Sequence, residues 1–462
     1  RATMTLTLES LNPATGERIK TVDLWNAAQL DSVLREIAAA SPAWQRTPFA
    51  KRARLFLAAA ARLRADAESF ARLITAEMGK PIREARAEIE KCALGCEFFA
   101  EHAEAMLADE VIATDAAKSY VRYQPLGTLL AVMPWNYPFW QLFRAAAPAM
   151  MAGNTVVMKH ASNVPQCALA IEEIFVQSGF PAGVFRTLLI SAAQAEQLVS
   201  DPRVHAVTLT GSEAAGRRVA AAAGTAIKKT VLELGGSDPF IILGDANLDT
   251  AIAGAVSGRF QNTGQSCIAA KRIIVTPQVA DEFVSGLRER IAALKVGDPL
   301  RDDTNIGPLA RADLRDQLHH QVTASISAGA KLLLGGSALA GPGFFYAPTL
   351  IDAVVPGMAA FEEELFGPVA VIIRARDEAD AMRLANQSRY GLGASIWTGN
   401  PTRGEALASE LECGQVFVNG IVRSDPRLPF GGIKASGYGR ELSVLGIREF
   451  VNAKTVWIAG TT

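Results

Sequence analysis

Cys267 is the residue whose surroundings point most directly to chemistry. It ends the polar run Phe260–Cys267, which contains Gln, Asn, Thr and Ser, and Gly264 lies three residues before it. A cysteine that packs for structure usually lies among aliphatic side chains, because a free thiol behaves as a small hydrophobe. A polar turn containing glycine can instead offer N–H donors to a thiolate or to an oxyanion formed on its target. Cys267 is therefore a candidate nucleophile, and an incidental loop cysteine is the alternative.

Two further residues have types suited to the same chemistry. Glu233 ends an apolar run that is typical of a buried strand, and Gly235 and Gly236 follow it. A carboxylate on such a flexible end can act as a general base. Asn136 lies in the rigid segment 134–138, between two prolines, where its amide could donate to an oxyanion. A solvent-facing Glu and a structural Asn remain the alternatives.

A possible phosphate-binding turn lies between a predicted strand and a predicted helix. The segment 208–216 contains Gly211 and Ser212, spaced Gly-x4-Gly. Ser212 can cap the helix while the neighbouring N–H groups hold a phosphate. Lys159 ends another predicted strand, at the edge of a parallel sheet where nucleotides bind. A plain capped helix, which the weak motif favours, and a solvated lysine are the alternatives.

The composition excludes several classes of partner. The 462 residues contain 46 Lys and Arg against 47 Asp and Glu, giving a net charge of −1, so we expect neither nucleic acid nor an anionic membrane surface as a ligand. No apolar stretch approaches the ~18 residues that a membrane span needs. The five cysteines include no C-x-x-C pair, which favours a reducing compartment, the cytoplasm, over a disulfide framework or a metal site.

The order of sequence patterns predicts an α/β protein. Residues 26–108 have helical periodicity, and strand-like and helical runs then alternate from 155 to 234 and again after Gly236. Residues 120–132 predict a β-hairpin with its turn at 125–127. The strand-like residues 449–458 have no evident sheet to join, which suggests β-pairing between subunits.

Six motifs, in this order, resemble the NAD(P)-dependent aldehyde dehydrogenase superfamily, most closely its bacterial Sad/YneI-type succinate semialdehyde dehydrogenases. They are Pro134–Asn136, Thr210–Ser212, Leu232–Gly236, Asn262–Cys267, Glu363–Pro368 and Pro429–Gly432. The resemblance covers nearly the whole chain and implies two doubly wound α/β domains and a small β oligomerisation arm. We expect a dinucleotide-binding domain at 1–113 and 132–234, a catalytic domain at 235–440, and the arm at 114–131 and 448–462.

The resemblance also implies roles for individual residues. Cys267 would be the nucleophile, Glu233 the base that activates water, and Asn136 the oxyanion donor. The cofactor, NAD or NADP, would be bound by Trp135, Lys159, Ser162, Gly211, Ser212, Glu364 and Phe366. The partners would be a small aldehyde and further copies of the chain, in a homodimer or a tetramer, and no metal ion is implied.

Cofactor choice is predicted from the residues after Lys159. Members of the family that select NAD carry an acidic residue three positions after the lysine, where this chain has Ser162, and His160 replaces the usual proline. Because no carboxylate repels the 2′-phosphate of NADP, we predict that both cofactors bind.

The substrate is predicted from four residues. Arg144 matches a carboxylate-binding arginine of succinate semialdehyde dehydrogenases, whereas a second such arginine is replaced by Gln261. Arg423 and Ser424 could supply the missing contacts. The sequence thus predicts oxidation of succinate semialdehyde, as in 4-aminobutyrate breakdown.

Three alternatives remain open. The chain could oxidise another semialdehyde or an aliphatic aldehyde, it could be a thiol hydrolase without redox chemistry, or it could bind nucleotides without catalysis. A thiol hydrolase would need a histidine paired with Cys267, and no motif suggests one.

Overall fold

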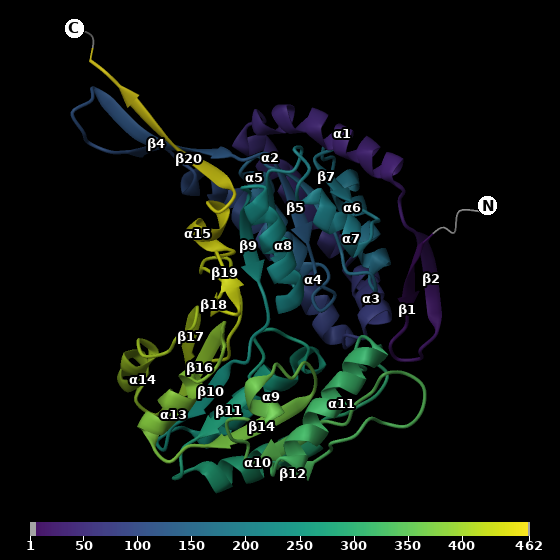
Figure 1. Cartoon of the computed structure of the whole chain (residues 1–462), viewed down its shortest axis with the longest axis vertical. Coiled ribbons are helices and arrows are strands. Elements are labelled where there is room, and N and C mark those ends of the chain that lie inside the picture. The colour runs from purple at the N-terminus through teal and green to yellow at the C-terminus, as the bar shows by residue number, and fades with distance from the viewer. Residues whose placement is uncertain (1–5, 461–462) are drawn as a thin grey trace.

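The computed structural model describes residues 6–460. The protein has two lobes, each built around a sheet, and Figure 1 shows one lobe above the other. A β arm projects from the upper lobe. Helices cover both sheets, which confirms the predicted α/β class. Within the described residues, no helix combines the length and apolar character that crossing a membrane requires.

The chain begins with a short antiparallel hairpin and four helices. The hairpin was not predicted, whereas the helices match the predicted helical segment. Asn26 starts the first helix through a reciprocal capping box with Gln29, and Gly79 ends the third helix in the left-handed region, at φ 82°. The elements are β1 (Thr7–Leu11), β2 (Arg18–Asp23), α1 (Ala27–Gln45), α2 (Phe49–Ala65), α3 (Ala67–Met78) and α4 (Ile82–Met106).

The upper lobe contains a six-stranded sheet in the order β19-β9-β8-β5-β6-β7, parallel except for β19. Its central strands are apolar on both faces, as a sheet covered by helices requires. The strands are β5 (Thr128–Val132), β6 (Thr155–Lys159), β7 (Phe185–Thr187), β8 (Ala206–Thr210), β9 (Lys229–Glu233) and β19 (Gly437–Tyr438). The helices are α5 (Trp140–Met151), α6 (Pro165–Gln177), α7 (Ala192–Leu198) and α8 (Glu213–Thr225).

The lower lobe contains a seven-stranded sheet in the order β12-β13-β14-β11-β10-β16-β17, parallel except for the β12–β13 pair. Its strands are β10 (Pro239–Ile242), β11 (Arg272–Val275), β12 (Lys331–Leu334), β13 (Thr349–Asp352), β14 (Val369–Arg374), β16 (Gly393–Trp397) and β17 (Gln415–Val418). This sheet confirms the alternation of strands and helices that the sequence predicts after Gly236.

Helices and short strands complete the lower lobe and the C-terminal region. They are α9 (Leu248–Phe260), the 3₁₀ turn η1 (Gln261–Gly264), α10 (Ala280–Ala292), α11 (Ala312–Ser327), α12 (Ala359–Glu362), α13 (Glu378–Asn386), α14 (Pro401–Ala408), α15 (Ser443–Ile447), and the pair β15 (Tyr390–Gly391) and β18 (Ile433–Lys434).

The predicted hairpin at 120–132 is wrong. β4 (Lys118–Pro125) pairs with β3 (Glu110–Val111) and β20 (Val451–Ile458), whereas β5 joins the upper sheet between β6 and β8. The reason is burial: residues 128–131 are buried throughout, as in a central parallel strand, whereas β4 is partly exposed.

The prediction that the C-terminal strand has no sheet to join is also wrong. β20 pairs with β4 along its whole length, from Val451 opposite Pro125 to Ile458 opposite Lys118. Figure 1 shows these two strands extending away from both lobes. The assignment of domain limits remains a prediction.

A buried ion pair lies at the contact between α4 and the start of α5. The Lys80 ammonium and the Glu88 carboxylate are in contact, with side chains 0% and 1% exposed. Glu88 Oε1 also accepts hydrogen bonds from the backbone N–H groups of Phe139 and Trp140, at 2.9 and 3.0 Å. Lys80 lies 3.7 Å from the centre of the Tyr137 ring. These contacts fix the segment 134–138, which carries Asn136, against α4.

Replacement of Glu88 should therefore cost more stability than replacement of Lys80. Glu88→Leu leaves the Lys80 ammonium and two backbone N–H groups unsatisfied, which should cost about 3–5 kcal/mol. Lys80→Met should cost less, because Glu88 keeps its two N–H donors. Thermal and urea unfolding measure the difference, with Glu101→Gln, an exposed change on the same helix, as the control. Equal losses in the two variants would contradict this account.

Candidate active site

The turn before Cys267 has an unusual backbone. Asn262, Thr263 and Gly264 are all left-handed, with φ values of 53°, 56° and 75°. This region is costly for a β-branched residue such as Thr263 and persists only where surrounding contacts hold it. Gly264 has no alternative, because a Cβ there would lie 2.1 Å from the carbonyl oxygen of Gly367. The turn is a strained support for the thiol.

Contacts from three distant segments hold this turn. The carboxylate of Glu84, on α4, accepts a hydrogen bond from the backbone N–H of Asn262. Thr263 Oγ1 accepts one from the N–H of Gly307 at 3.0 Å. Asn262 Nδ2 donates to the carbonyl oxygen of Asn136 at 2.8 Å. The bond between Asn262 and Asn136 links the turn before Cys267 to the segment that carries the candidate oxyanion donor. Asn136 Nδ2 itself donates to the Gln265 carbonyl oxygen at 3.2 Å.

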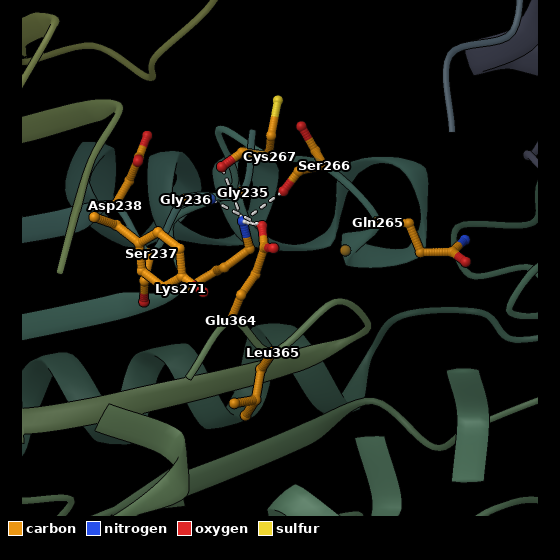
Figure 2. Close-up of polar contacts among 12 residues, drawn as sticks. Gly235, Gly236, Ser237, Asp238, Gln265, Ser266, Cys267, Lys271, Glu364 and Leu365 are labelled. Carbon is orange, nitrogen blue, oxygen red and sulfur yellow. Dashed lines mark hydrogen bonds and ion pairs between the residues drawn. The ribbon is translucent and has the colours of Figure 1, made fainter. Parts of the chain in front are cut away.

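A buried lysine, Lys271, binds the backbone carbonyl groups that follow the same turn. Lys271 Nζ donates to the carbonyl oxygens of Ser266 and Cys267, at 2.7 and 2.9 Å, and to Glu364 Oε1 at 3.0 Å. Figure 2 shows these contacts, with the Cys267 side chain directed away from the Lys271 ammonium. Glu364 Oε1 also accepts a hydrogen bond from the Gly236 N–H at 3.0 Å. The sequence analysis missed Lys271, which has no motif of its own.

Cys267 lies between two cavities. The first, of about 250 Å³, is lined by eight of the predicted residues, including the N-terminus of α8. The rings of Trp135 and Phe366 form part of its wall, edge to face at 5.7 Å and 88°. The eight residues are Trp135, Asn136, Gly211, Ser212, Glu233, Cys267, Glu364 and Phe366.

Two predicted cofactor residues lie outside this lining. Lys159 is half-buried at the end of β6, and Ser162 is exposed just beyond it. Between them, His160 is buried, and burial lowers its pKa to about 4. The neutral ring therefore donates from Nε2 to the Pro138 carbonyl oxygen at 2.8 Å and accepts at Nδ1 from the Ala161 N–H at 2.8 Å. His160 thus joins the end of β6 to the segment that carries Asn136.

The second cavity, of about 120 Å³, lies on the other side of Cys267. All four predicted substrate residues line it: Arg144, Gln261, Arg423 and Ser424. Arg144, however, forms an ion pair with the buried Glu441 and lies 4.5 Å from the centre of the Phe430 ring. Six further polar or aromatic residues of the lining lie in none of the six motifs and were not predicted: Glu84, Glu88, Lys91, Tyr137, Trp140 and Gln141.

Comparisons with known proteins identify the family. The aldehyde dehydrogenase family model matches residues 2–456. The chain belongs to the aldehyde dehydrogenase family. A Synechocystis protein named "Probable succinate-semialdehyde dehydrogenase [NADP(+)]" is 53% identical, over 98% of this chain and 100% of that protein. "Succinate-semialdehyde dehydrogenase [NADP(+)] 1" of Mycobacterium bovis is 51% identical, over 98% of this chain and 100% of that protein.

A solved aldehyde dehydrogenase structure agrees closely with this fold. The succinic semialdehyde dehydrogenase of Streptococcus pyogenes, in complex with NADP+, superposes with a TM-score of 0.96 at 37% identity, covering 98% of this chain and 100% of that one. The predicted aldehyde dehydrogenase architecture is therefore confirmed.

Glu233 of this aldehyde dehydrogenase carries a carboxyl group whose surroundings favour its protonated, neutral form. Its side chain is 2% exposed, and neither carboxyl oxygen has a hydrogen-bond partner among the described residues. Burial raises its pKa well above the usual range, and the nearby Glu441 carboxylate raises it further, against the opposing charges of Arg144 and Arg440. An unpaired buried carboxyl group directed at a cavity can exchange a proton with a molecule bound there.

The thiol of Cys267 is also neutral at rest. Burial raises its pKa to about 11, although the positive charges of Arg144 and Lys271 oppose the shift. At pH 7 the protonated thiol therefore predominates in the free protein. The other four cysteines are Cys92, Cys96 and Cys167, which are buried, and Cys413, whose pKa burial raises to about 12. None of them competes as a thiolate.

Alkylation of Cys267 by iodoacetamide should therefore accelerate with pH. In the free protein, the rate should rise about tenfold per pH unit between pH 7 and 10, because the thiolate is the reactive form. Mass spectrometry of the peptide that contains Cys267 measures the rate, and Cys267→Ser provides the unlabelled control. An alkylation rate that stops rising below pH 9 would show that the thiol ionises readily even when no substrate or cofactor is bound.

Proposed function

We propose that this aldehyde dehydrogenase oxidises succinate semialdehyde to succinate with NADP+ or NAD+, through a thiohemiacetal and a thioester on Cys267, as in 4-aminobutyrate breakdown. The observation that carries the proposal is the position of Cys267 between two cavities of different character. One is bounded by a helix N-terminus and two aromatic rings, and the other by several cations. The names of the most similar relatives support the same substrate.

The first cavity suits a nicotinamide dinucleotide. The N-terminus of α8 presents unpaired N–H groups beside Ser212, which favour a pyrophosphate. Thr210 Oγ1 is buried there without a hydrogen-bond partner among the described residues. Lys159 and Ser162 would face the adenosine ribose at the end of β6, and Ser162 brings no carboxylate against a 2′-phosphate. These features support use of both NADP+ and NAD+.

The first covalent step joins Cys267 to the aldehyde. The Cys267 thiol gives up its proton to water, and the thiolate sulfur forms a bond to the carbonyl carbon, whose oxygen takes up the negative charge. Asn136 Nδ2 donates to that oxygen, a contact typically worth about 3 kcal/mol in a transition state. When bound, a nicotinamide cofactor accepts the hydride that leaves this carbon, so a thioester on Cys267 remains.

The second covalent step releases the acid. Glu233, once ionised, removes a proton from a water molecule, whose oxygen attacks the thioester carbon. The carbon–sulfur bond then breaks, the carboxylic acid forms, and the Cys267 sulfur leaves as a thiolate. Because burial disfavours the ionised form of Glu233, the carboxylate is a strong base once formed.

The hydrolase alternative is not favoured. A thiol hydrolase needs a histidine that accepts the thiol proton, and none of the five histidines lines either cavity. An aldehyde dehydrogenase for a longer or neutral aldehyde fits the nucleophile equally well but leaves the cations of the second cavity without a role.

We also propose that the β arm mediates self-association, in a homodimer or a tetramer. The arm leaves the body of the protein (Figure 1) and exposes apolar side chains that a monomer would not bury. They are Val111, Ile112, Trp457 and Ile458, between 45% and 72% exposed.

A substrate panel run with both cofactors tests the proposed function. Reduced-nicotinamide absorbance should show the highest kcat/KM for succinate semialdehyde, at least about tenfold above butanal, glutarate semialdehyde and hexanal. The ratio of kcat/KM values between NAD+ and NADP+ should stay below about a thousandfold. Higher activity on hexanal than on succinate semialdehyde would show that the protein prefers aliphatic aldehydes. A larger preference for NAD+ would contradict the interpretation of Ser162.

Glu233→Gln should separate the two covalent steps. The variant should still release about one reduced nicotinamide per subunit in a rapid burst, because thioester formation does not need the general base. Steady-state turnover should then fall by about 10²-fold or more. Stopped-flow absorbance measures both phases, and Cys267→Ser, which should show neither, is the matched control. Normal turnover in Glu233→Gln would assign the base to another group.

A further inference from the structure

The second cavity lacks the arginine expected from the resemblance, because Gln261 occupies its place. Arg144 remains, but Glu441 neutralises much of its charge. Arg423 is exposed at the cavity wall. A short chain ending in a carboxylate therefore needs another positive group within this cavity.

Lys91, on α4, is such a group. Its side chain lines the second cavity, and its Nζ lies 4.8 Å from the centre of the Trp140 ring. Among residues 6–460, no carboxylate forms an ion pair with Lys91. Two acidic groups that act on Lys91, Glu88 and Asp425, are paired instead with Lys80 and Arg427. Lys91 thus keeps a positive charge without a carboxylate partner.

Ser424 is oriented by Lys91. Its Oγ accepts hydrogen bonds from Lys91 Nζ at 2.6 Å and from Trp140 Nε1 at 3.2 Å. A hydroxyl group has two acceptor positions and one hydrogen. Since both acceptor positions are filled, the Ser424 hydroxyl can act only as a donor, and it donates to no group among the described residues. Ammonium and hydroxyl together therefore offer donors to one anion.

We propose that Lys91 and Ser424 form the site for the carboxylate of the substrate, with Lys91 as a specificity-determining residue. The inference rests on the proposed function. The ammonium supplies charge, the hydroxyl supplies a directed hydrogen bond, and Cys267 borders the same cavity for the aldehyde end. Burial beside Arg144 lowers the pKa of Lys91 to about 8, so Lys91 is mostly protonated at pH 7, and an arriving carboxylate would raise that pKa again.

Variants of Lys91 test this site with two substrates of similar length. Succinate semialdehyde carries the carboxylate, and butanal lacks it. Lys91→Met should lower kcat/KM for succinate semialdehyde about 30-fold or more, mainly through KM, because a hydrogen-bonded charge is lost. Activity on butanal should stay within about threefold. Lys91→Gln, which keeps a donor for Ser424 but no charge, should behave similarly, and Lys91→Arg should retain a preference for the semialdehyde.

The control is Lys51→Met, which removes an exposed lysine from α2 outside both cavities and should change neither substrate. An unchanged preference in Lys91→Met and Lys91→Gln would overturn the proposal. Parallel loss of both activities in these two variants would also overturn it, by assigning Lys91 to the fold. If the unmodified protein shows no preference for succinate semialdehyde over butanal, the proposed function fails instead, whatever the variants do.

Discussion

Three consecutive left-handed residues, 262–264, are the constraint on which the site depends. Such a turn survives only where its surroundings determine every backbone group, and here those surroundings come from α4, from the segment 134–138 and from the lower lobe. The nucleophile is therefore positioned by distant parts of the chain more than by its own segment. The hydrogen bonds that hold the turn therefore also connect the two lobes.

Electrostatics follow from that placement. The charged groups around Cys267 are largely paired within the protein: Lys271 with Glu364, Arg144 with Glu441, and Lys80 with Glu88. Lys91, the carboxyl group of Glu233 and the thiol have no ion-pair partner among the described residues, and burial raises the pKa of both Glu233 and the thiol. The resting site thus holds its reactive groups protonated, which protects the thiol from electrophiles until ligands alter the local charge.

Motif residues could be predicted from the sequence because each follows a strand end or a glycine turn that is visible in the pattern. Glu233 and Ser212 are examples, and the structure places both on the first cavity. Lys91 and Lys271 could not be predicted in this way. Lys91 is an ordinary residue of a long helix, and its significance arises only when Ser424, more than three hundred positions away, meets it. The error at β4 and β5 has the same origin, since adjacency in sequence was taken for pairing.

The C-terminal segment has a consequence for how the protein is made. Within residues 433–458, β18 pairs with β15, β19 pairs with β9, and β20 pairs with β4. Glu441, the ion-pair partner of Arg144, lies in the same stretch. Domains fold from the N-terminus during synthesis, yet the ion pair between Arg144 and Glu441 cannot form until residue 441 has left the ribosome. A nascent chain that stops before Glu441 therefore lacks the ion-pair partner of Arg144 at the second cavity.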